Sequence, residues 1–334
     1  MDDDRRVVGL RRLTALVALP SGLRGALAVE AQQPRPRAGR NAAATRPAPD
    51  VQDARYGPHE RNVLDLWKAR SPEPAPLLVF IHGGGFRGGD KSQVPLNVLA
   101  ACLREGISVA SINYRLSHQA PFPAPMLDGA RAIQFLRLQA REWNLDPRRI
   151  AASGGSAGAG ISLWIGFHDD LADPKSDDPV LRQSSRLACM AVNGAQCTYD
   201  PRWIRENIGA AAAAHPALLP FYGITEEEAE SQKAAKLYEQ AAPITYLTRD
   251  DPPVWALYAE PDGPLPADAK PGAGIHHPKF GRYLKEKMDA LGIECVVRHT
   301  DEFRSRRNAR GGAEGEMVAF LVKHLKPRRT TQGR

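Results

Sequence analysis

The chain has 334 residues, of which 43% are apolar and 25% charged, an ordinary composition for a globular protein. Its 45 Lys and Arg residues outnumber its 38 Asp and Glu residues, which gives a formal net charge of +7. These values exclude a disordered chain, a collagen-like fibre and a polytopic membrane protein, and four cysteines in this length exclude a disulfide scaffold. The positive excess is spread along the chain, so it does not predict nucleic-acid binding.

The N-terminal segment has the order of a secretory signal peptide. Four arginines precede an apolar run over residues 13–19, and small residues follow at 26–31. This order predicts a cleaved signal over residues 1–31 and a secreted or periplasmic protein. Asp2 and Pro20 depart from the pattern, so the alternatives are a disordered extension or a mistaken start codon, which would leave the protein cytoplasmic. The apolar run is too short to span a bilayer, so we expect no stable membrane anchor.

Three further features lie outside the regular pattern. Residues 32–55 are rich in Pro, Ala and Arg and are predicted to form a flexible linker, and residues 327–334 form a basic tail.

An arginine cluster could bind phosphate or acidic polysaccharide, although a solvated loop is the favoured interpretation. The cysteines have no CxxC spacing, which predicts buried free thiols and no metal site. The cluster comprises Arg304, Arg306, Arg307 and Arg310, and the cysteines are Cys102, Cys189, Cys197 and Cys295.

From Tyr56 onward, short apolar runs alternate with longer amphipathic ones. Such alternation predicts one α/β domain over residues 56–326, a mostly parallel sheet with helices on both faces. Strands are predicted at residues 62–67, 77–81, 107–114, 150–152, 187–192, 254–258 and 293–297. Helices are predicted at residues 126–143, 157–167, 280–291 and 314–326.

The stretch from about residue 199 to 249 breaks this alternation. It is rich in Ala and Glu, predominantly helical in pattern, and contains the aromatic residues Trp203, Phe221, Tyr222 and Tyr238. Fifty residues without a strand predict a helical cap inserted over the edge of the sheet where the loops gather.

The first chemical motif is Gly154-Gly155-Ser156-Ala157-Gly158, between a predicted strand and a predicted helix. A serine on such a sharp turn has a strained backbone, and side chains at the flanking positions would collide with neighbouring elements. The turn exposes the hydroxyl of Ser156 and places the N–H of Ala157 at a helix N-terminus, where it can face a developing negative charge. Taken alone, the same residues could form a simple tight turn.

The second motif is His82-Gly83-Gly84-Gly85-Phe86, directly after a buried strand. Its glycines leave the N–H groups of Gly84 and Gly85 free to complete an oxyanion hole with Ala157, and His82 is better interpreted as bracing the loop than as a base. With these two motifs, and with Asn113-Tyr114-Arg115-Leu116 and Asp146-Pro147-Arg148-Arg149-Ile150, the chain resembles the α/β-hydrolase family over residues 56–325. The similarity is to HGGG-type esterases and lipases related to hormone-sensitive lipase and bacterial carboxylesterases.

The resemblance implies a Ser–acid–His triad in that chain order. The acid is expected in the loop after the strand at 254–258, where Asp262 matches the position best. Glu260 and Asp268 are the alternatives, and each of these carboxylates could equally be an ordinary surface group.

The histidine of the triad is expected after the last strand. The corresponding position falls near Arg304, and the nearest histidine is His299, which we assign as the base. This assignment requires the strand to end by Arg298 and predicts His299 within hydrogen-bonding distance of Ser156. His276 and His277 are the rivals, and a chain with no functional histidine is the further alternative.

The implied reaction is the hydrolysis of carboxylic esters. Short-chain acyl or aryl esters are the expected substrates, because the aromatic residues of the cap suggest a modest apolar pocket. Ser156 would attack the carbonyl while His299 takes its proton and Asp262 orients the imidazole, without a metal or organic cofactor. The substrate would be a small-molecule or polysaccharide-linked ester, such as an acetylated or feruloylated plant polysaccharide. The alternatives are a non-catalytic ligand-binding protein of the same fold and a peptidase.

Overall fold

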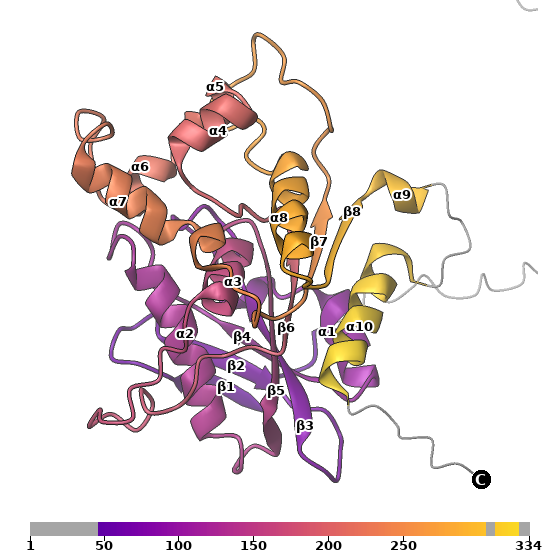
Figure 1. Cartoon of the computed structure of the whole chain (residues 1–334). Coiled ribbons are helices and arrows are strands. Elements are labelled where there is room, and N and C mark those ends of the chain that lie inside the picture. Colours follow the sequence, from indigo (N-terminus) through magenta and orange to yellow (C-terminus); the bar gives the residue numbers. More distant parts are fainter. Residues whose placement is uncertain (1–45, 305–310, 327–334) are drawn as a thin grey trace, which may run out of the picture. The chain divides into compact units, whose positions relative to one another are not determined.

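A computed structural model describes residues 46–304 and 311–326, and a single eight-stranded sheet runs through this part of the chain (Figure 1). The strand order is β1-β2-β4-β3-β5-β6-β7-β8, in which β2 runs antiparallel to both neighbours and all pairs from β4 to β8 are parallel. The predicted α/β architecture with a mostly parallel sheet is confirmed. The strands are β1 (Val51–Arg55), β2 (Val63–Trp67), β3 (Ala75–Ile81), β4 (Ser108–Ile112), β5 (Leu145–Gly155), β6 (Cys189–Asn193), β7 (Val254–Tyr258) and β8 (Cys295–His299).

Helices bury both faces of this sheet. Along the fully buried β3, Leu77 and Val79 belong to one hydrophobic cluster, whereas Leu78 and Phe80 belong to the other, because alternate side chains of a strand point to opposite faces. The first cluster includes residues of α2 (Ala124–Leu138), α3 (Ala157–Phe167) and α8 (Lys279–Ala290). The second includes residues of α1 (Leu96–Arg104) and α10 (Gly312–Leu325).

The parallel strands bring several loops to one edge of the sheet. Ile81 at the end of β3 pairs with Gly154 of β5, and Gly155 pairs with Asn193 of β6. Asn193 in turn pairs with Leu257 of β7. The loops that follow β3, β5, β6 and β7 therefore start side by side at the carboxyl edge, which is where ligand sites form in such sheets.

The predicted cap is present between β6 and β7. It consists of α4 (Pro201–Asn207), α5 (Ala210–Ala213), α6 (Leu218–Tyr222), α7 (Gln232–Ala241) and the 3₁₀ helix η2 (Pro243–Tyr246) (Figure 1). Phe221 of α6 stacks on Phe86 of the glycine-rich loop, with ring centroids 4.2 Å apart. The cap is thus packed directly onto the carboxyl edge.

Several predicted boundaries differ from those of the structure; for example, β5 covers Leu145–Gly155 where residues 150–152 were predicted. Residues 51–55 were assigned to the linker but form the edge strand β1. The sequence VQDAR has no apolar run that would have marked a strand, because none of its side chains is fully buried. Helix α2 ends at Leu138, not at residue 143, and β8 extends to His299. Two short helices were not predicted: α1 and α9 (Asp301–Arg304).

Several predictions concern residues outside the described part of the chain. These are the signal peptide at 1–31, most of the linker, the tail from residue 327, and the arginine cluster beyond Arg304. Arg304 itself forms an ion pair with Asp301 at 2.9 Å. All four cysteines are buried and free, as predicted. Within residues 46–304 and 311–326, every helix is too short or too polar to cross a lipid bilayer.

Candidate active site

Ser156 occupies the sharp turn between β5 and α3. Its backbone has φ 53° and ψ −119°, a conformation that is strained for a residue with a side chain. A Cβ at Gly154 would lie 2.4 Å from the carbonyl oxygen of Ile81, and one at Gly158 would lie 2.0 Å from the same atom. The flanking glycines are therefore required by the close approach of β3, the steric reason that the sequence predicted.

The glycine-rich loop after β3 lies against this turn. A Cβ at Gly83 would approach the carbonyl oxygen of Gly155 to 2.8 Å, and Gly84 and Gly85 both have positive φ angles, 108° and 59°. Gly85, Ser156 and Ala157 line the same pocket. Because Ala157 begins α3, its N–H has no partner within the helix. Two of the three predicted oxyanion residues, Gly85 and Ala157, thus line the pocket that contains Ser156.

His82 is buried beneath the glycine-rich loop and holds it in place. Its ring stacks on Tyr114 with centroids 4.3 Å apart, and its Nε2 lies 3.2 Å from Nη2 of Arg61. A guanidinium can only donate, so Nε2 accepts, and Nδ1 then carries the proton that it donates to the carbonyl of Gly83 at 2.8 Å. Burial first, and the charge on Arg61 in addition, lower the pKa of His82 to about 4. His82 is therefore a neutral brace.

The histidine next to the serine is His276. Its Nε2 lies 2.8 Å from Oγ of Ser156, and its Nδ1 lies 3.2 Å from Oε1 of Glu260. The same carboxylate oxygen accepts the backbone N–H of His276 at 3.3 Å. Glycine at position 194 makes room for this ring, since a Cβ there would lie 3.1 to 3.2 Å from ring and Cβ atoms of His276. The structure therefore brings Ser156, His276 and Glu260 together in that order, through a hydrogen bond and then a 3.2 Å contact between imidazole and carboxylate.

His299 does not occupy the predicted place beside Ser156. His299 is the last residue of β8, paired with Tyr258, so the strand does not end by Arg298 as the assignment required. Its Nε2 bonds the carbonyl oxygen of Glu260 at 3.0 Å, and its backbone N–H donates to Glu302. His299 thus contacts the loop that carries the carboxylate, whereas His276 occupies the place beside Ser156.

The other predicted residues of this region also have different neighbours. Asp262 forms an exposed ion pair with Arg282, whose hydrogen bond lowers the pKa of this carboxylate. His277 is buried, with Nε2 2.9 Å from the carbonyl oxygen of Gly263. Asp268 lies exposed in the same loop. His276 contacts Ser156, and Glu260 contacts His276; each of them was predicted from the sequence only as an alternative.

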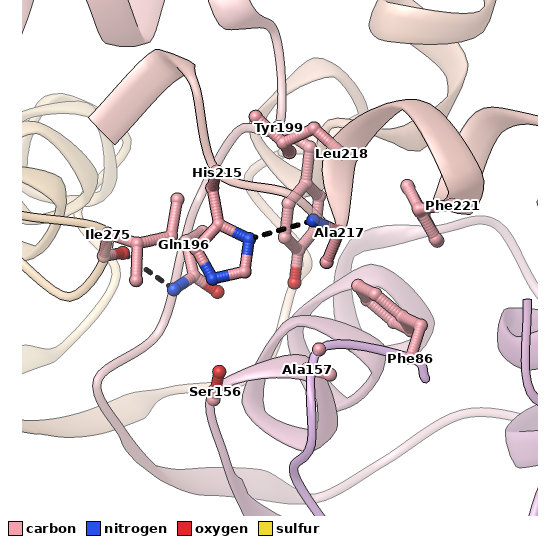
Figure 2. Close-up of a pocket in the computed structure, with 11 residues that line it drawn as sticks. Phe86, Ser156, Ala157, Gln196, Tyr199, His215, Ala217, Leu218, Phe221 and Ile275 are labelled. Carbon is pink, nitrogen blue, oxygen red and sulfur yellow. Dashed lines mark hydrogen bonds between the residues drawn. The ribbon is translucent and has the colours of Figure 1, made fainter. Parts of the chain in front are cut away.

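Two hollows of different size flank Ser156. One lies under the cap and is lined by apolar residues, with about 320 Å³ of space that includes the part open to solvent (Figure 2). The other is a trough of about 1130 Å³ on the same measure, and both His276 and Glu260 line it. The residues of the cap-side pocket are Gly85, Phe86, Ser156, Ala157, Gln196, Tyr199, His215, Ala217, Leu218, Phe221 and Ile275.

This geometry defines a class of protein. Ser156 lies on a strand–helix elbow at the carboxyl edge of the sheet, next to a histidine that in turn contacts a carboxylate. Together with the strand order, this is the arrangement of an α/β-hydrolase. A family model described as BD-FAE matches residues 64–269, more than half of the chain. The chain belongs to the BD-FAE family of α/β-hydrolases.

Relatives identified by sequence carry esterase names. "Esterase LipQ" of Mycobacterium tuberculosis is 29% identical over 224 residues, which are 66% of this chain and 51% of that protein. "Probable carboxylesterase 6" of Arabidopsis thaliana is 42% identical over 107 residues, 30% of this chain and 31% of that protein. The chain spans about half the length of LipQ and of two further mycobacterial relatives, LipM and LipC.

Solved structures share the fold at lower identity. "Truncated form of carbohydrate esterase from gut microbiota" has a TM-score of 0.61 at 18% identity, covering 83% of this chain and 96% of that one. "Bacterial Heroin Esterase" has a TM-score of 0.57 at 20% identity, covering 79% and 80%. At such identities the likeness concerns the fold.

Proposed function

We propose that the protein is a serine-dependent hydrolase of carboxylic esters, with Ser156 as nucleophile, His276 as general base and Glu260 as the acid of the triad. The observation that carries this proposal is the 2.8 Å contact between Nε2 of His276 and Oγ of Ser156. A nucleophile within hydrogen-bonding distance of a base, which a third group orients in turn, is the signature of nucleophilic catalysis. The esterase names of the sequence relatives support the same reaction.

The residues take part in two successive steps. His276 removes the hydroxyl proton as Oγ of Ser156 bonds to the ester carbonyl carbon, and the N–H groups of Gly84, Gly85 and Ala157 stabilise the oxyanion. His276 then gives the proton to the departing alcohol oxygen, which leaves an acyl-enzyme. Water, deprotonated by the same imidazole, attacks the acyl carbonyl, and Ser156 recovers its proton as the carboxylic acid leaves. Glu260 holds the Nδ1 proton and stabilises the imidazolium.

The two hollows suggest how an ester lies across the site. The alcohol oxygen must receive its proton from His276, and the trough is lined by His276 whereas the cap-side pocket is not. We therefore place the alcohol in the trough and the acyl group in the smaller apolar pocket. The proposed substrates are esters of short acyl groups on alcohols that can be large, which include acylated carbohydrates. That a structural neighbour is titled a carbohydrate esterase supports this choice.

The alternative of a non-catalytic protein rested on the lack of a histidine near Arg304. His276 beside Ser156 removes that argument, because the loop after β7 supplies the imidazole. A peptidase of this fold stays an outcome of the test below, since the same triad can attack amides.

The test is hydrolysis of p-nitrophenyl acetate, butyrate and decanoate, with a p-nitroanilide in parallel. We expect the parent to hydrolyse the two short esters fastest, and Ser156→Ala to lower kcat by about 10⁴-fold or more. Ser71→Ala, in the loop between β2 and β3, is the matched control and keeps full activity. A parent without ester hydrolysis above background would contradict the proposal, and faster cleavage of the anilide would indicate a peptidase.

A further inference from the structure

His215 lies at the boundary between the cap and the active site. It belongs to the connection between α5 and α6 and lines the small pocket together with Ser156, Gly85 and Ala157. Its Cε1 is 3.8 Å from the position that a Cβ at Gly85 would take, and its Cδ2 is 2.9 Å from that of a Cβ at Gly272. The ring is therefore wedged between the glycine-rich loop and the loop that carries Glu260 and His276.

The hydrogen bonding of the ring determines which nitrogen carries its proton. Nδ1 of His215 accepts the backbone N–H of Ala217 at 3.1 Å, so in the neutral ring the proton sits on Nε2. Burial first, and then the neighbouring His276 and Arg87, lower the pKa of His215, which favours this neutral form. Figure 2 shows the second ring nitrogen on the side that faces Ser156 and Gln196. The side chain thus presents an N–H donor to the pocket.

The surroundings of this donor are predominantly apolar. Phe86, Leu218, Phe221 and Ile275 form much of the pocket wall. Gln196 also lines the pocket, and its Nε2 donates to the carbonyl of Ile275 at 2.7 Å. A donor in an apolar pocket discriminates strongly between ligands with and without a matching acceptor. A ligand without the acceptor displaces water from the donor and leaves the donor without a hydrogen-bond partner.

We propose that His215 is a specificity-determining residue, whose Nε2–H donates a hydrogen bond to an oxygen in the acyl group and so favours oxygen-bearing short acyl chains over plain alkyl chains. The inference rests on the proposed esterase function and on placement of the acyl group in the small pocket. It requires an acyl chain with an ether, hydroxyl or methoxy oxygen close to the ester carbonyl.

Two pairs of p-nitrophenyl esters test the preference with little change in shape. Methoxyacetate is compared with butyrate, and 3-methoxypropionate with pentanoate, so that in each pair one oxygen replaces one methylene. The measured quantity is the ratio of kcat/KM for the oxygen-bearing ester to kcat/KM for the alkyl ester. Dividing the parent's ratio by that of a variant cancels the different intrinsic reactivities of the two esters.

Three variants separate recognition from structural damage. His215→Asn retains an acceptor for the N–H of Ala217 but lacks the donor at Nε2, whereas His215→Gln can place an amide N–H close to Nε2. We expect the ratio to fall about tenfold in at least one pair with His215→Asn and to fall less with His215→Gln. His118→Asn makes the same change at an exposed histidine and leaves the ratio unchanged.

Equal ratios in the parent and in His215→Asn, for both pairs, would overturn the inference while leaving the esterase function intact. A parent that hydrolyses none of the four esters would overturn both. A ratio that falls equally with His118→Asn would also contradict a specific role for His215.

Discussion

The segments that follow β7 and β8 differ in what they contribute to the site. The loop after β7 supplies both Glu260 and His276, whereas the segment after β8 begins with the short helix α9. Ser156 follows β5, and β7 lies two strands from β5 while β8 lies three strands away. With strands about 4.8 Å apart, these offsets are about 10 Å and 14 Å. A histidine from the β7 loop therefore starts nearer to the serine, and the order Ser–acid–His along the chain is kept.

The segment after β8 still contributes to this arrangement. Nδ1 of His299 accepts the backbone N–H of Asp301 at 3.3 Å, so Nε2 carries a proton and donates it to the carbonyl oxygen of Glu260. The residue that the sequence favoured as the base thus holds the backbone of the residue that bears the carboxylate. In the proposed mechanism, therefore, the segment after β7 supplies the reacting groups and the segment after β8 supports them.

The largest expected effect separates the two histidines. His276→Ala removes the base and should lower kcat for p-nitrophenyl acetate by about 10⁴-fold or more. His299→Ala removes only a support and should lower kcat by no more than about three- to tenfold. The measurement is steady-state kinetics of both variants, with circular dichroism to verify folding. A greater loss with His299→Ala than with His276→Ala would reverse the assignment of the two segments.

The next effect separates the two carboxylates of the β7 loop. Glu260→Gln keeps the shape of the side chain but no longer stabilises the imidazolium, so kcat should fall by about 10² to 10⁴-fold. Asp262→Asn only breaks an exposed ion pair with Arg282 and should change kcat less than twofold. If Asp262→Asn proved the more damaging change, Glu260 could not be the acid of the triad.

A third change acts on the space that His276 occupies. Gly194→Ala puts a Cβ 3.1 to 3.2 Å from atoms of His276 at a position with φ 55°, so kcat should fall about tenfold or more as the imidazole shifts. Gly292→Ala is the control, since φ there is 75° and no atom lies within 4 Å of the added Cβ. Both variants should lose about 1 kcal/mol of stability, measured by urea unfolding, but only the first should lose activity. Equal kcat values for the two would show that this glycine does not position the histidine.

A smaller effect sharpens the supporting role of His299. His299→Gln retains a donor near Nε2, so it should restore activity relative to His299→Ala, for which we expect a loss of about three- to tenfold. Kinetics across pH 6 to 9 would compare the two variants with the parent. Identical activity of all three would mean that the bond to the carbonyl of Glu260 has no influence on the reaction.

The last prediction concerns the pH dependence of stability and tests the third histidine of this edge, His82. Its folded pKa of about 4 lies below the unfolded value, so the unfolded state binds more protons between about pH 6.5 and 4. Stability is therefore unaffected above this window and falls as the pH drops through it, by about 3 kcal/mol in all. His82→Gln should make the unfolding free energy, measured by urea titration at several pH values, less steep in this window. His118→Gln is the control, and a parent-like slope for His82→Gln would contradict the prediction.

The sequence predicted most of what depends on local pattern. Helix α3 and strand β7 have the predicted bounds, because an apolar run and adjoining glycines or prolines mark each of them. The elbow at Ser156 and the loop at Gly83 to Gly85 were also predicted, since their chemistry is contained within a few consecutive residues.

The partners of the serine depend on a long loop and could not be predicted in the same way. The 20 residues from Ala259 to Pro278 have no apolar periodicity, and their path depends on contacts such as the bond from Gly272 N–H to the carbonyl of Ala211. One signal was present: Gly272 and Gly274 come shortly before His276, and closely spaced glycines are typical of a loop that turns tightly. The prediction favoured the strand at 293–297 as the source of the histidine and kept His276 only as a rival.

The brace at His82 has a consequence for the range of conditions under which the enzyme can work. Protons compete with Arg61 for Nε2 of His82, and a protonated ring beside a guanidinium would be repelled from it. Acid would therefore act on the glycine-rich loop that is proposed to bind the oxyanion. The lowest pH at which such an enzyme works would then be set by the order of its backbone. Extending activity to lower pH would mean replacing a buried histidine that has no part in the chemical steps.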